Sequence, residues 1–323
     1  RDCLLSRGLG DVYKRQNYEI VQNPDGTLAI KFATTTDTKV VIPDVIKIGD
    51  KVYRITEVYE KAFKDNTTLK EVTISQNVSK IGNSAFEGCT SLEKVTLKEG
   101  LVTIGDKAFK GCSSLTSITM PATLQKIGNY AFENCTKLKT VKLNEGLLTI
   151  GKKAFYNCKA LKKVKIPKSV LKIGSYAFAK CAALTSFTFA TDSQLMSMGT
   201  GVLSNDKKLT KIKLPGKLTA VPSKAFKNDT KLASVTIGKS VTKIGAEAFN
   251  GCKKIKKVTI PTKVQTIGEK AFYNCKSLKT VSIKSKALTS VGEKAFKKCK
   301  KGLKLVVPGK KTTAYKKLLN GKY

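Results

Sequence analysis

The sequence predicts an α/β solenoid in which about eleven copies of a 23-residue unit stack along one axis. Three observations support it. An Ala-Phe pair recurs at a near-constant interval, a short alternating apolar segment precedes each pair, and Gly or Asn follows most of the pairs. We expect each unit to place one strand in a parallel β-sheet on one face and a short helical turn on the other.

The Ala-Phe pair sets the period of the array. Consecutive Phe residues lie 23 positions apart, with a 25-residue step to a degenerate copy, Val202-Leu203, and a 24-residue step into Phe296. Aromatic residues at a fixed place in every unit are expected to form its core. The predicted core aromatics are Phe86, Phe109, Phe132, Phe155, Phe178, Phe226, Phe249 and Phe272.

The rest of each unit follows one pattern, which residues 161–181 illustrate. Residues 164–166 alternate apolar and polar, which predicts a short strand, and Pro167 ends its pairing. Val170 and Ile173 are expected to point inward through a turn, and Gly174 to permit a close backbone approach. Gly or Asn two residues after Phe tolerates positive φ and would cap the helical turn.

The ends differ from the repeats. We interpret residues 1–16 as a non-native remnant, in which case any export signal of the parent protein lies outside this sequence. Residues 17–54 are expected to form an N-terminal β cap, because a turn signal at Asp25-Gly26 separates two apolar stretches. The solenoid would span 55–308, and 309–323 would hold a C-terminal cap helix.

Eight of the nine cysteines fall three residues after the repeat Phe. A metal or redox array is one interpretation, but it needs clustered ligands such as C-x-x-C, and neither that motif nor any His occurs. We therefore favour a ladder of buried free thiols and expect no metal and no cofactor. Asn66, Asp206 and Asp229 replace Cys in three units. The ladder comprises Cys89, Cys112, Cys135, Cys158, Cys181, Cys252, Cys275 and Cys299.

Catalysis finds little support in the sequence. The absence of His excludes His-dependent nucleophiles, and no phosphate-binding loop is present. Paired carboxylates could still act as acid and base, but no carboxylate pair recurs. We expect no catalytic residues and no enzyme activity.

The pattern I-P-x-x-V-x-x-I-G-x-x-A-F-x-x-C, found at residues 166–181 and 260–275, resembles bacterial leucine-rich repeats of the BspA or Treponema pallidum type. The resemblance covers residues 55–308. It implies a right-handed leucine-rich repeat array in a secreted or surface protein of a host-associated microbe, with adhesion or host binding as its role.

The outward strand positions form a polar face of Ser, Thr and Lys without aromatic residues. Lysine concentrates in the middle of that face, where it could bind an acidic partner. Because lysine is plentiful throughout the chain, we favour the simpler explanation that these lysines solubilise the exposed sheet. The candidate ligand-binding residues are Lys142, Lys163, Lys165, Lys211 and Lys213.

The net charge of +38 comes from 61 basic and 23 acidic residues, yet only four of the basic residues are Arg. Because specific base and phosphate recognition favours the arginine fork, we expect no specific nucleic-acid partner. No apolar run is long enough to span a membrane. A second candidate region is the irregular unit at 191–206, whose two extra residues indicate either a functional loop or sequence drift.

These observations predict a monomeric, extracellular or cell-surface binding module that recognises a host protein or an acidic cell-surface polymer through its strand face. Two alternatives remain open. One is a spacer array that displays another domain, and the other is a charge-driven polyanion binder.

Overall fold

The computed structural model describes residues 18–33, 35–309 and 312–321. The chain divides into two compact units, residues 1–158 and 159–323, and each is described here by itself. The expected non-native remnant at residues 1–16 lies outside the described residues.

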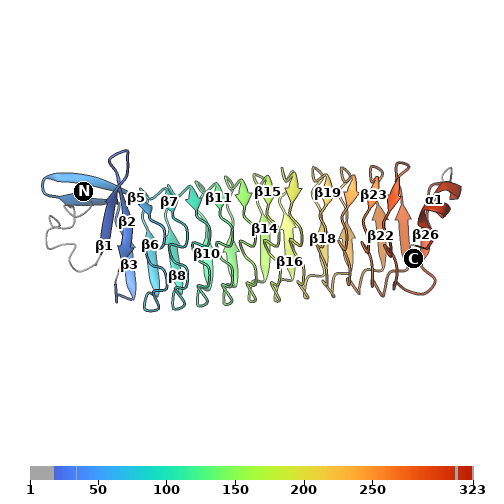
Figure 1. Ribbon diagram of the computed structural model, residues 1–323, viewed down its shortest axis with the longest axis horizontal. Helices are drawn as coiled ribbons and strands as arrows, with labels where there is room; N and C mark the ends of the chain where they lie inside the picture. Colours follow the sequence, from blue (N-terminus) through green and yellow to red (C-terminus); the bar gives the residue numbers. More distant parts are fainter. Residues whose placement is uncertain (1–17, 34, 310–311, 322–323) are drawn as a thin grey trace. The chain divides into compact units, whose positions relative to one another are not determined.

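The first unit contains two parallel sheets, so each turn carries two strands rather than the one expected (Figure 1). One sheet has the predicted strands β3 (Lys39–Ile42), β6 (Glu71–Ile74), β8 (Lys94–Leu97), β10 (Ser117–Thr119) and β12 (Thr140–Lys142). The other has β5 (Lys51–Val58), β7 (Lys80–Ile81), β9 (Thr103–Ile104), β11 (Lys126–Ile127) and β13 (Thr149–Ile150).

An antiparallel hairpin precedes these turns. Strands β1 (Tyr18–Gln22) and β2 (Leu28–Ala33) pair across the predicted turn, where Gly26 has a φ of 83°. Strand β2 then pairs in parallel with β5, and β4 (Val45–Ile48) pairs with β5 in the antiparallel sense. The predicted hairpin is therefore present, and so is the early repeat strand β3, although the division of the chain into a cap and a solenoid stays a prediction.

The second unit repeats the arrangement with shorter sheets. Strand β14 (Lys163–Ile166) pairs with β16 (Ser186–Phe189), and β15 (Lys172–Ile173) with β17 (Ser197–Met198). Three further sheets follow. The first pairs β18 (Lys211–Lys213) with β20 (Ser234–Thr236), and the second contains β19 (Ala220–Val221), β21 (Lys243–Ile244), β23 (Thr266–Ile267) and β25 (Ser290–Val291). The third contains β22 (Lys257–Ile260), β24 (Thr280–Ile283) and β26 (Lys304–Val306). Counting β3, the described chain has about 12 turns, one more than expected.

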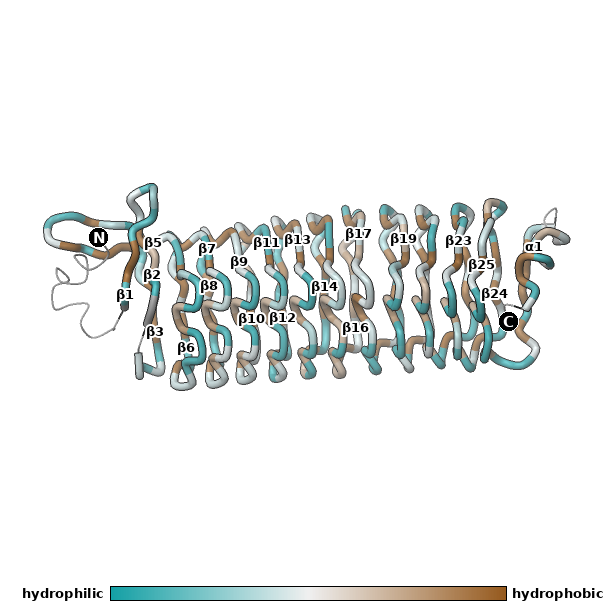
Figure 2. Tube along the Cα trace, in the orientation of Figure 1, coloured by the Kyte–Doolittle hydropathy of each residue, from teal (hydrophilic) through white to brown (hydrophobic). Residues whose placement is uncertain are grey.

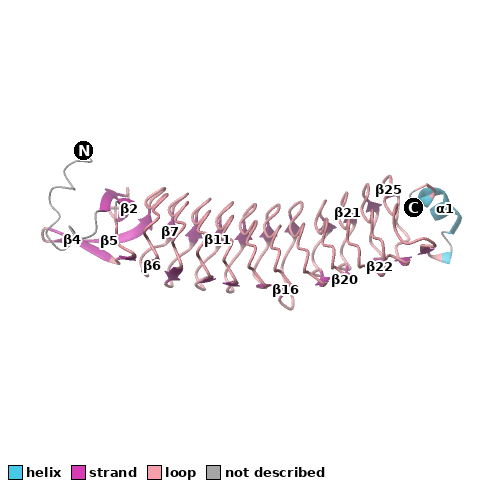
Figure 3. Ribbon diagram, turned by 90° about the horizontal axis from the view of Figure 1, so that it is seen from below, coloured by secondary structure: helices cyan, strands magenta, loops and turns pink. Residues whose placement is uncertain are grey.

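The expected helical turns are wrong: the Ala-Phe segments are β-type turns, and the fold is a β-solenoid (Figure 3). Ser84, directly before the Ala-Phe pair, has a φ of 55°, and Gly88, two residues after the Phe, has a φ of 77°. The N–H of Phe86 donates to the carbonyl of Ala108 in the next turn at 2.7 Å, and that of Gly88 to Lys110 at 2.8 Å. A helix would need these N–H groups for its own carbonyls and would exclude left-handed residues.

Phenylalanine rings form stacked columns in the core. Within the first unit the rings from Phe63 to Phe155 stack with centroids 4.9 to 5.2 Å apart. Within the second, the rings from Phe226 to Phe296 stack with centroids 5.0 to 5.4 Å apart. All the predicted core Phe residues are completely buried. Figure 2 shows that hydrophobic residues recur at equivalent places in successive turns, as this packing requires.

The repeated glycine sets how closely two turns approach. A Cβ on Gly128 would lie 2.5 Å from the backbone carbonyl carbon of Gly105, and one on Gly105 would lie 2.7 Å from that of Gly82. These distances are shorter than any carbon–carbon contact allows. The column of glycines is therefore a steric requirement of the stacking.

A single helix among the described residues, α1 (Thr312–Leu319), closes the second unit. The buried Tyr315 hydroxyl donates to the carbonyl of Ser285 at 3.0 Å and accepts from the N–H of Leu288 at 3.1 Å. Ser285 lies in the unit with the 24-residue step, and its Oγ donates to the carbonyl of Val264 at 2.6 Å. The extra residue in that step thus lies where the helix docks.

Candidate functional site

The outward strand positions are exposed or half-buried throughout, as the alternation predicted. Lys163 and Lys165 lie exposed on β14, and Lys211 and Lys213 lie exposed on β18. None of these four has an ion pair with a carboxylate of the described residues. Lys142 is exposed on β12 in the first unit.

The two lysine-bearing strands of the second unit do not adjoin. Strand β16 pairs with β14, with Ser186 opposite Lys163 and Thr188 opposite Lys165. A hydroxyl-bearing strand thus separates β14 from β18. Within the second unit the predicted lysines therefore lie in pairs along β14 and β18, with β16 between the two pairs.

Both sheets of the second unit are interrupted between the same two turns. Strand β16 has no ladder to β18, and β17 has none to β19. Pro222 explains the second interruption, because it occupies the glycine position of its turn. In neighbouring turns the N–H of Gly199 donates to Ile173 and that of Gly245 to Val221, each at 2.8 Å. Proline has no N–H to donate.

Pro222 also carries the Cβ that the glycine position excludes. A Cβ on Gly199 would lie 2.2 Å from the backbone nitrogen of Ser175 in the preceding turn. The two turns stay hydrogen-bonded beyond the proline, because the N–H of Gly201 donates to the carbonyl of Ser223 at 2.9 Å. We attribute the missing ladder between β17 and β19 to Pro222, whereas the other sheet is also interrupted between β20 and β22, where Gly245 keeps the glycine position.

The irregular unit lies on the other side of this interruption. Its two extra residues fall between Phe189, at the end of β16, and Leu195, which takes the place of Val170 in the repeat. Asp192 in this turn has a φ of 57°. The insertion therefore lengthens the turn after β16 and leaves the buried positions Leu195 and Met198 in register.

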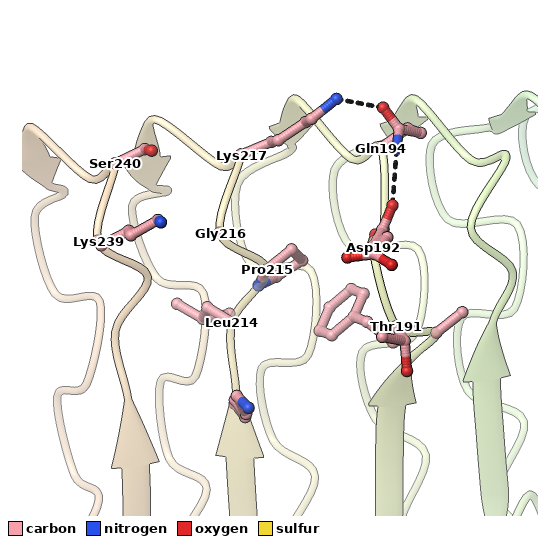
Figure 4. Close-up of a pocket in the computed structure, with 13 residues that line it drawn as sticks. Thr191, Asp192, Gln194, Leu214, Pro215, Gly216, Lys217, Lys239 and Ser240 are labelled. Carbon is pink, nitrogen blue, oxygen red and sulfur yellow. Dashed lines mark hydrogen bonds between the residues drawn. The ribbon is translucent and has the colours of Figure 1, made fainter.

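A cavity of about 590 Å³ opens at this place, which we call the irregular-turn pocket (Figure 4). Its wall combines apolar groups, three lysines and hydroxyl or amide groups. The residues used below are Phe189, Asp192, Gln194, Lys213, Pro215, Lys217 and Lys239.

Hydrogen bonds order one rim of the pocket. Gln194 Nε2 donates to the backbone carbonyl of Asp192 at 2.7 Å, and Lys217 Nζ donates to Gln194 Oε1 (Figure 4). Lys213 and Lys239 are exposed and form no ion pair with a described carboxylate. Because Asp192 is the one acidic residue among the lining residues, the pocket carries an excess of positive charge.

An aromatic side chain supports the other wall. Phe189 is half-buried and packs edge-to-face on Phe187, with ring centroids 5.4 Å apart. Phe187 in turn packs against the core ring of Phe178 at 5.1 Å. The rigid core therefore holds an apolar surface beside the lysines.

Sequence reasoning named Lys213 and the irregular unit as separate candidates, and the structure joins them in one pocket. It missed Lys217 and Lys239, which come from later turns of the chain. Pro222, in a position that glycine fills in each of the other turns from Gly82 to Gly292, was the available signal.

The cysteine ladder has a structural explanation. Cys89 Sγ donates to the carbonyl of Phe63 at 3.0 Å, and Cys252 Sγ donates to that of Phe226 at 3.0 Å. Burial raises the pKa of the Cys89 thiol to about 12, and that of Cys299 to about 11. A thiol that resists ionisation is a poor nucleophile and metal ligand. Within the described residues no three His, Cys, Asp or Glu side chains gather as a metal site would require.

Comparison with known proteins identifies the class and then the family. The repeated turns are those of a leucine-rich repeat protein, and the chain belongs to the BspA-type leucine-rich repeat family. The model of that family, the BspA type leucine rich repeat region, matches in six copies, which include residues 56–185, 102–232 and 219–321. A search among curated proteins finds no significant relative.

Solved structures of bacterial leucine-rich repeat proteins share the fold. The Treponema pallidum leucine-rich repeat protein is 31% identical, over 59% of this chain and 87% of that one, with a TM-score of 0.55. The pneumococcal vaccine antigen PcpA is 22% identical, over 96% and 95%, with a TM-score of 0.56. A leucine-rich cell surface protein of Faecalibacterium prausnitzii is 22% identical, over 92% and 95%, with a TM-score of 0.48.

The described residues contain no helix with the length and apolar character that a bilayer span needs.

Proposed function

We propose that this protein is a non-enzymatic binding module of the cell surface or its exterior, and that it holds an acidic segment of a partner protein in the irregular-turn pocket. The observation that carries the proposal is the pocket itself. It places Lys213 and Lys239, neither of them ion-paired with a described carboxylate, beside the half-buried ring of Phe189. Family membership supports the general role, since BspA-type repeat proteins are typically surface-type binding or adhesion modules.

The chemistry of the wall favours a protein over a bare anion. Phe189 and Pro215 offer apolar contact, while the lysines offer charge-assisted hydrogen bonds to carboxylates. A segment with one apolar side chain flanked by Asp or Glu satisfies both. The strand face, with Lys211 and Thr236 exposed next to the pocket, extends the contact surface.

A spacer that binds nothing is the weaker explanation. The pocket lies at a departure from the repeat, the insertion after β16, which is not needed to continue the stacking.

The test compares two soluble probes, a labelled Glu-Tyr random copolymer and poly-glutamate of equal length. We expect the copolymer to bind more tightly, because it alone supplies an apolar group for the pocket. Lys213→Gln with Lys239→Gln should weaken copolymer binding about fivefold or more. Lys243→Gln with Lys263→Gln removes the same charge from exposed sites outside the pocket and serves as the control.

Equal losses in the two variants would show that net charge alone drives binding and would overturn the proposal. Equal affinity for the two polymers would exclude the apolar contact. Tighter binding to an acidic glycan than to the copolymer, lost in the pocket variant alone, would replace the protein partner by a cell-surface polymer.

A further inference from the structure

A second concentration of positive charge lies away from the irregular-turn pocket. A second cavity of about 600 Å³ is lined by six lysines together with Ser277 and Cys299, and we call it the lysine cradle. Its lysines are Lys256, Lys276, Lys279, Lys298, Lys300 and Lys301. No acidic residue lines it, and none of the six forms an ion pair with a described carboxylate.

The solenoid places these lysines in rows. The N–H of Lys279 donates to the carbonyl of Lys256 at 2.8 Å, so these two residues occupy equivalent places in neighbouring turns. Lys276 and Lys300 each follow a ladder cysteine directly and are likewise equivalent. Neighbouring turns of a parallel sheet are about 4.8 Å apart. Lysines of neighbouring turns therefore start from backbone positions at short, regular intervals beside the cavity.

Lys298 lies two residues after the repeat Phe and has a φ of 60°. Most equivalent turns place Gly or Asn at this position, as at Gly111 and Asn274, although Lys180 is a second lysine there with a φ of 61°. The Lys298 ammonium lies 5.4 Å from the ring centroid of Tyr273, which fixes the side chain beside the cavity. Six like charges so close together repel one another unless an anion lies between them.

We propose that the lysine cradle binds a polyanionic chain that carries closely spaced sulfate or phosphate groups. Several ammonium groups around one concavity match several oxyanions on one chain. Lysine neutralises such groups as a point charge without demanding the bidentate geometry that arginine imposes. No aromatic side chain lines the cradle, and the neighbouring ring of Tyr273 already contacts the Lys298 ammonium, so the cradle offers no open stacking platform for bases. The site thus favours a polymer without bases over single-stranded nucleic acid.

This site is independent of the pocket proposed for the protein partner. It shares no lining residue with that pocket, and its ligand differs in chemistry. Failure of either proposal leaves the other standing.

The experiment measures binding of fluorescein-labelled heparin and of labelled inorganic polyphosphate across salt concentrations, with labelled poly-dT as the base-bearing comparison. The cradle variant combines Lys256→Gln, Lys279→Gln, Lys298→Gln and Lys301→Gln. The matched control combines Lys172→Gln, Lys243→Gln, Lys263→Gln and Lys286→Gln, which are exposed and lie outside both cavities.

We expect the cradle variant to bind the preferred polymer about tenfold more weakly at physiological salt. The slope of log K against log salt concentration should become shallower by about 0.7 for each contacting lysine removed. The control should lose less than about twofold. Whichever of heparin and polyphosphate binds more tightly then identifies sulfate or phosphate as the ligand group.

Equal losses in the cradle and control variants, absence of binding to both polymers, or tighter binding to poly-dT would each overturn the proposal. Hydrogen exchange on the unaltered protein gives a second readout. Bound polymer should slow exchange at residues 276–279 and 298–301, and protection confined to other turns would contradict the assignment.

Discussion

The backbone N–H of Asp206 donates a 2.8 Å hydrogen bond to Oδ1 of Asp229, one turn further along the solenoid. Both side chains are completely buried, and neither Oδ2 atom has a hydrogen-bond partner. These residues occupy the cysteine position of their turns, where Cys252 donates its thiol proton to a carbonyl of the preceding turn. A carboxyl group can act as that donor only when it is protonated.

The pKa values of Asp206 and Asp229 indicate that both carboxyl groups are protonated in the folded chain. Burial raises the pKa of both carboxyl groups well above the ordinary range, and Asp229 raises that of Asp206 further. The column neighbours are Cys181, whose N–H donates to Asp206 Oδ1 at 2.7 Å, and Cys252, whose own thiol pKa is raised. No cation of the described residues forms an ion pair with either Asp. The folded chain therefore keeps these protons at a pH where the unfolded chain releases them.

The first prediction concerns pH. The folded pKa values lie above the unfolded value of about 3.9, so the fold is favoured below that pH and loses stability as pH rises toward the folded values. Each carboxyl can contribute a loss of up to about 1.4 kcal/mol per pH unit within that window. Asp206→Cys with Asp229→Cys restores the thiol donors and removes the effect. The Tm advantage of this variant over the unaltered protein should grow from pH 4 to pH 7, measured by circular dichroism. A constant difference would show that both carboxyls are ionised in the fold.

The second prediction concerns thiol reactivity. Burial raises the pKa of the ladder thiols, so a disulfide reagent at pH 8 should react with Cys299, which is half-buried, well before the other seven. The assay uses a Cys3→Ser background, so that only ladder thiols are counted. Unfolding in guanidinium should release all the remaining thiols at once. Rapid labelling of Cys135 in the folded protein would contradict the buried ladder.

The third prediction tests the cause of the interrupted sheets. Pro222→Gly restores the N–H and removes the Cβ, so β17 and β19 should pair as their neighbours do. The new hydrogen bond and the greater freedom of the unfolded chain nearly offset each other, and stability should change by no more than about 1 kcal/mol. The N–H at position 222 should exchange slowly. Rapid exchange there would show that the missing N–H is not what keeps β17 and β19 from pairing.

The fourth prediction concerns the docked helix. Tyr315→Phe leaves the carbonyl of Ser285 and the N–H of Leu288 without their buried partner. We expect a loss of about 1 to 3 kcal/mol of unfolding free energy, measured by urea denaturation. Tyr59→Phe is the control, because that side chain is exposed. A loss no larger than the control's would show that α1 contributes little to closing the solenoid.

Much of the fold could be predicted because it is periodic. The spacing of Phe86 from Phe109 predicts the repeat length, and the alternation around Val164 predicts one of the two strands in each turn. The second strand, such as β9, has two residues and is too short to show a period of its own. The prediction of a helical turn is wrong because Gly and Asn after the Phe suit a helix cap and a left-handed turn residue alike. The matching left-handed residues before Ala, such as Ser84, carry no compositional signal.

The candidate pocket could be predicted only in part for a related reason. Lys213 and the insertion are visible in the sequence, but Lys239 enters the pocket from the next turn along the chain. Which side chains meet in a pocket depends on how neighbouring turns stack, and spacing along the sequence does not report those contacts.

The thiol ladder also bears on how such a chain changes length. Cys112 donates to Phe86 as Cys135 donates to Phe109, so equivalent atoms meet at every junction. Excision or duplication of one 23-residue unit by unequal recombination would rejoin the same donor with the same acceptor. Regular turns are therefore interchangeable genetic cassettes. The turn that carries Pro222 is not interchangeable in this way, because it supplies Lys213 and Lys217 to the irregular-turn pocket.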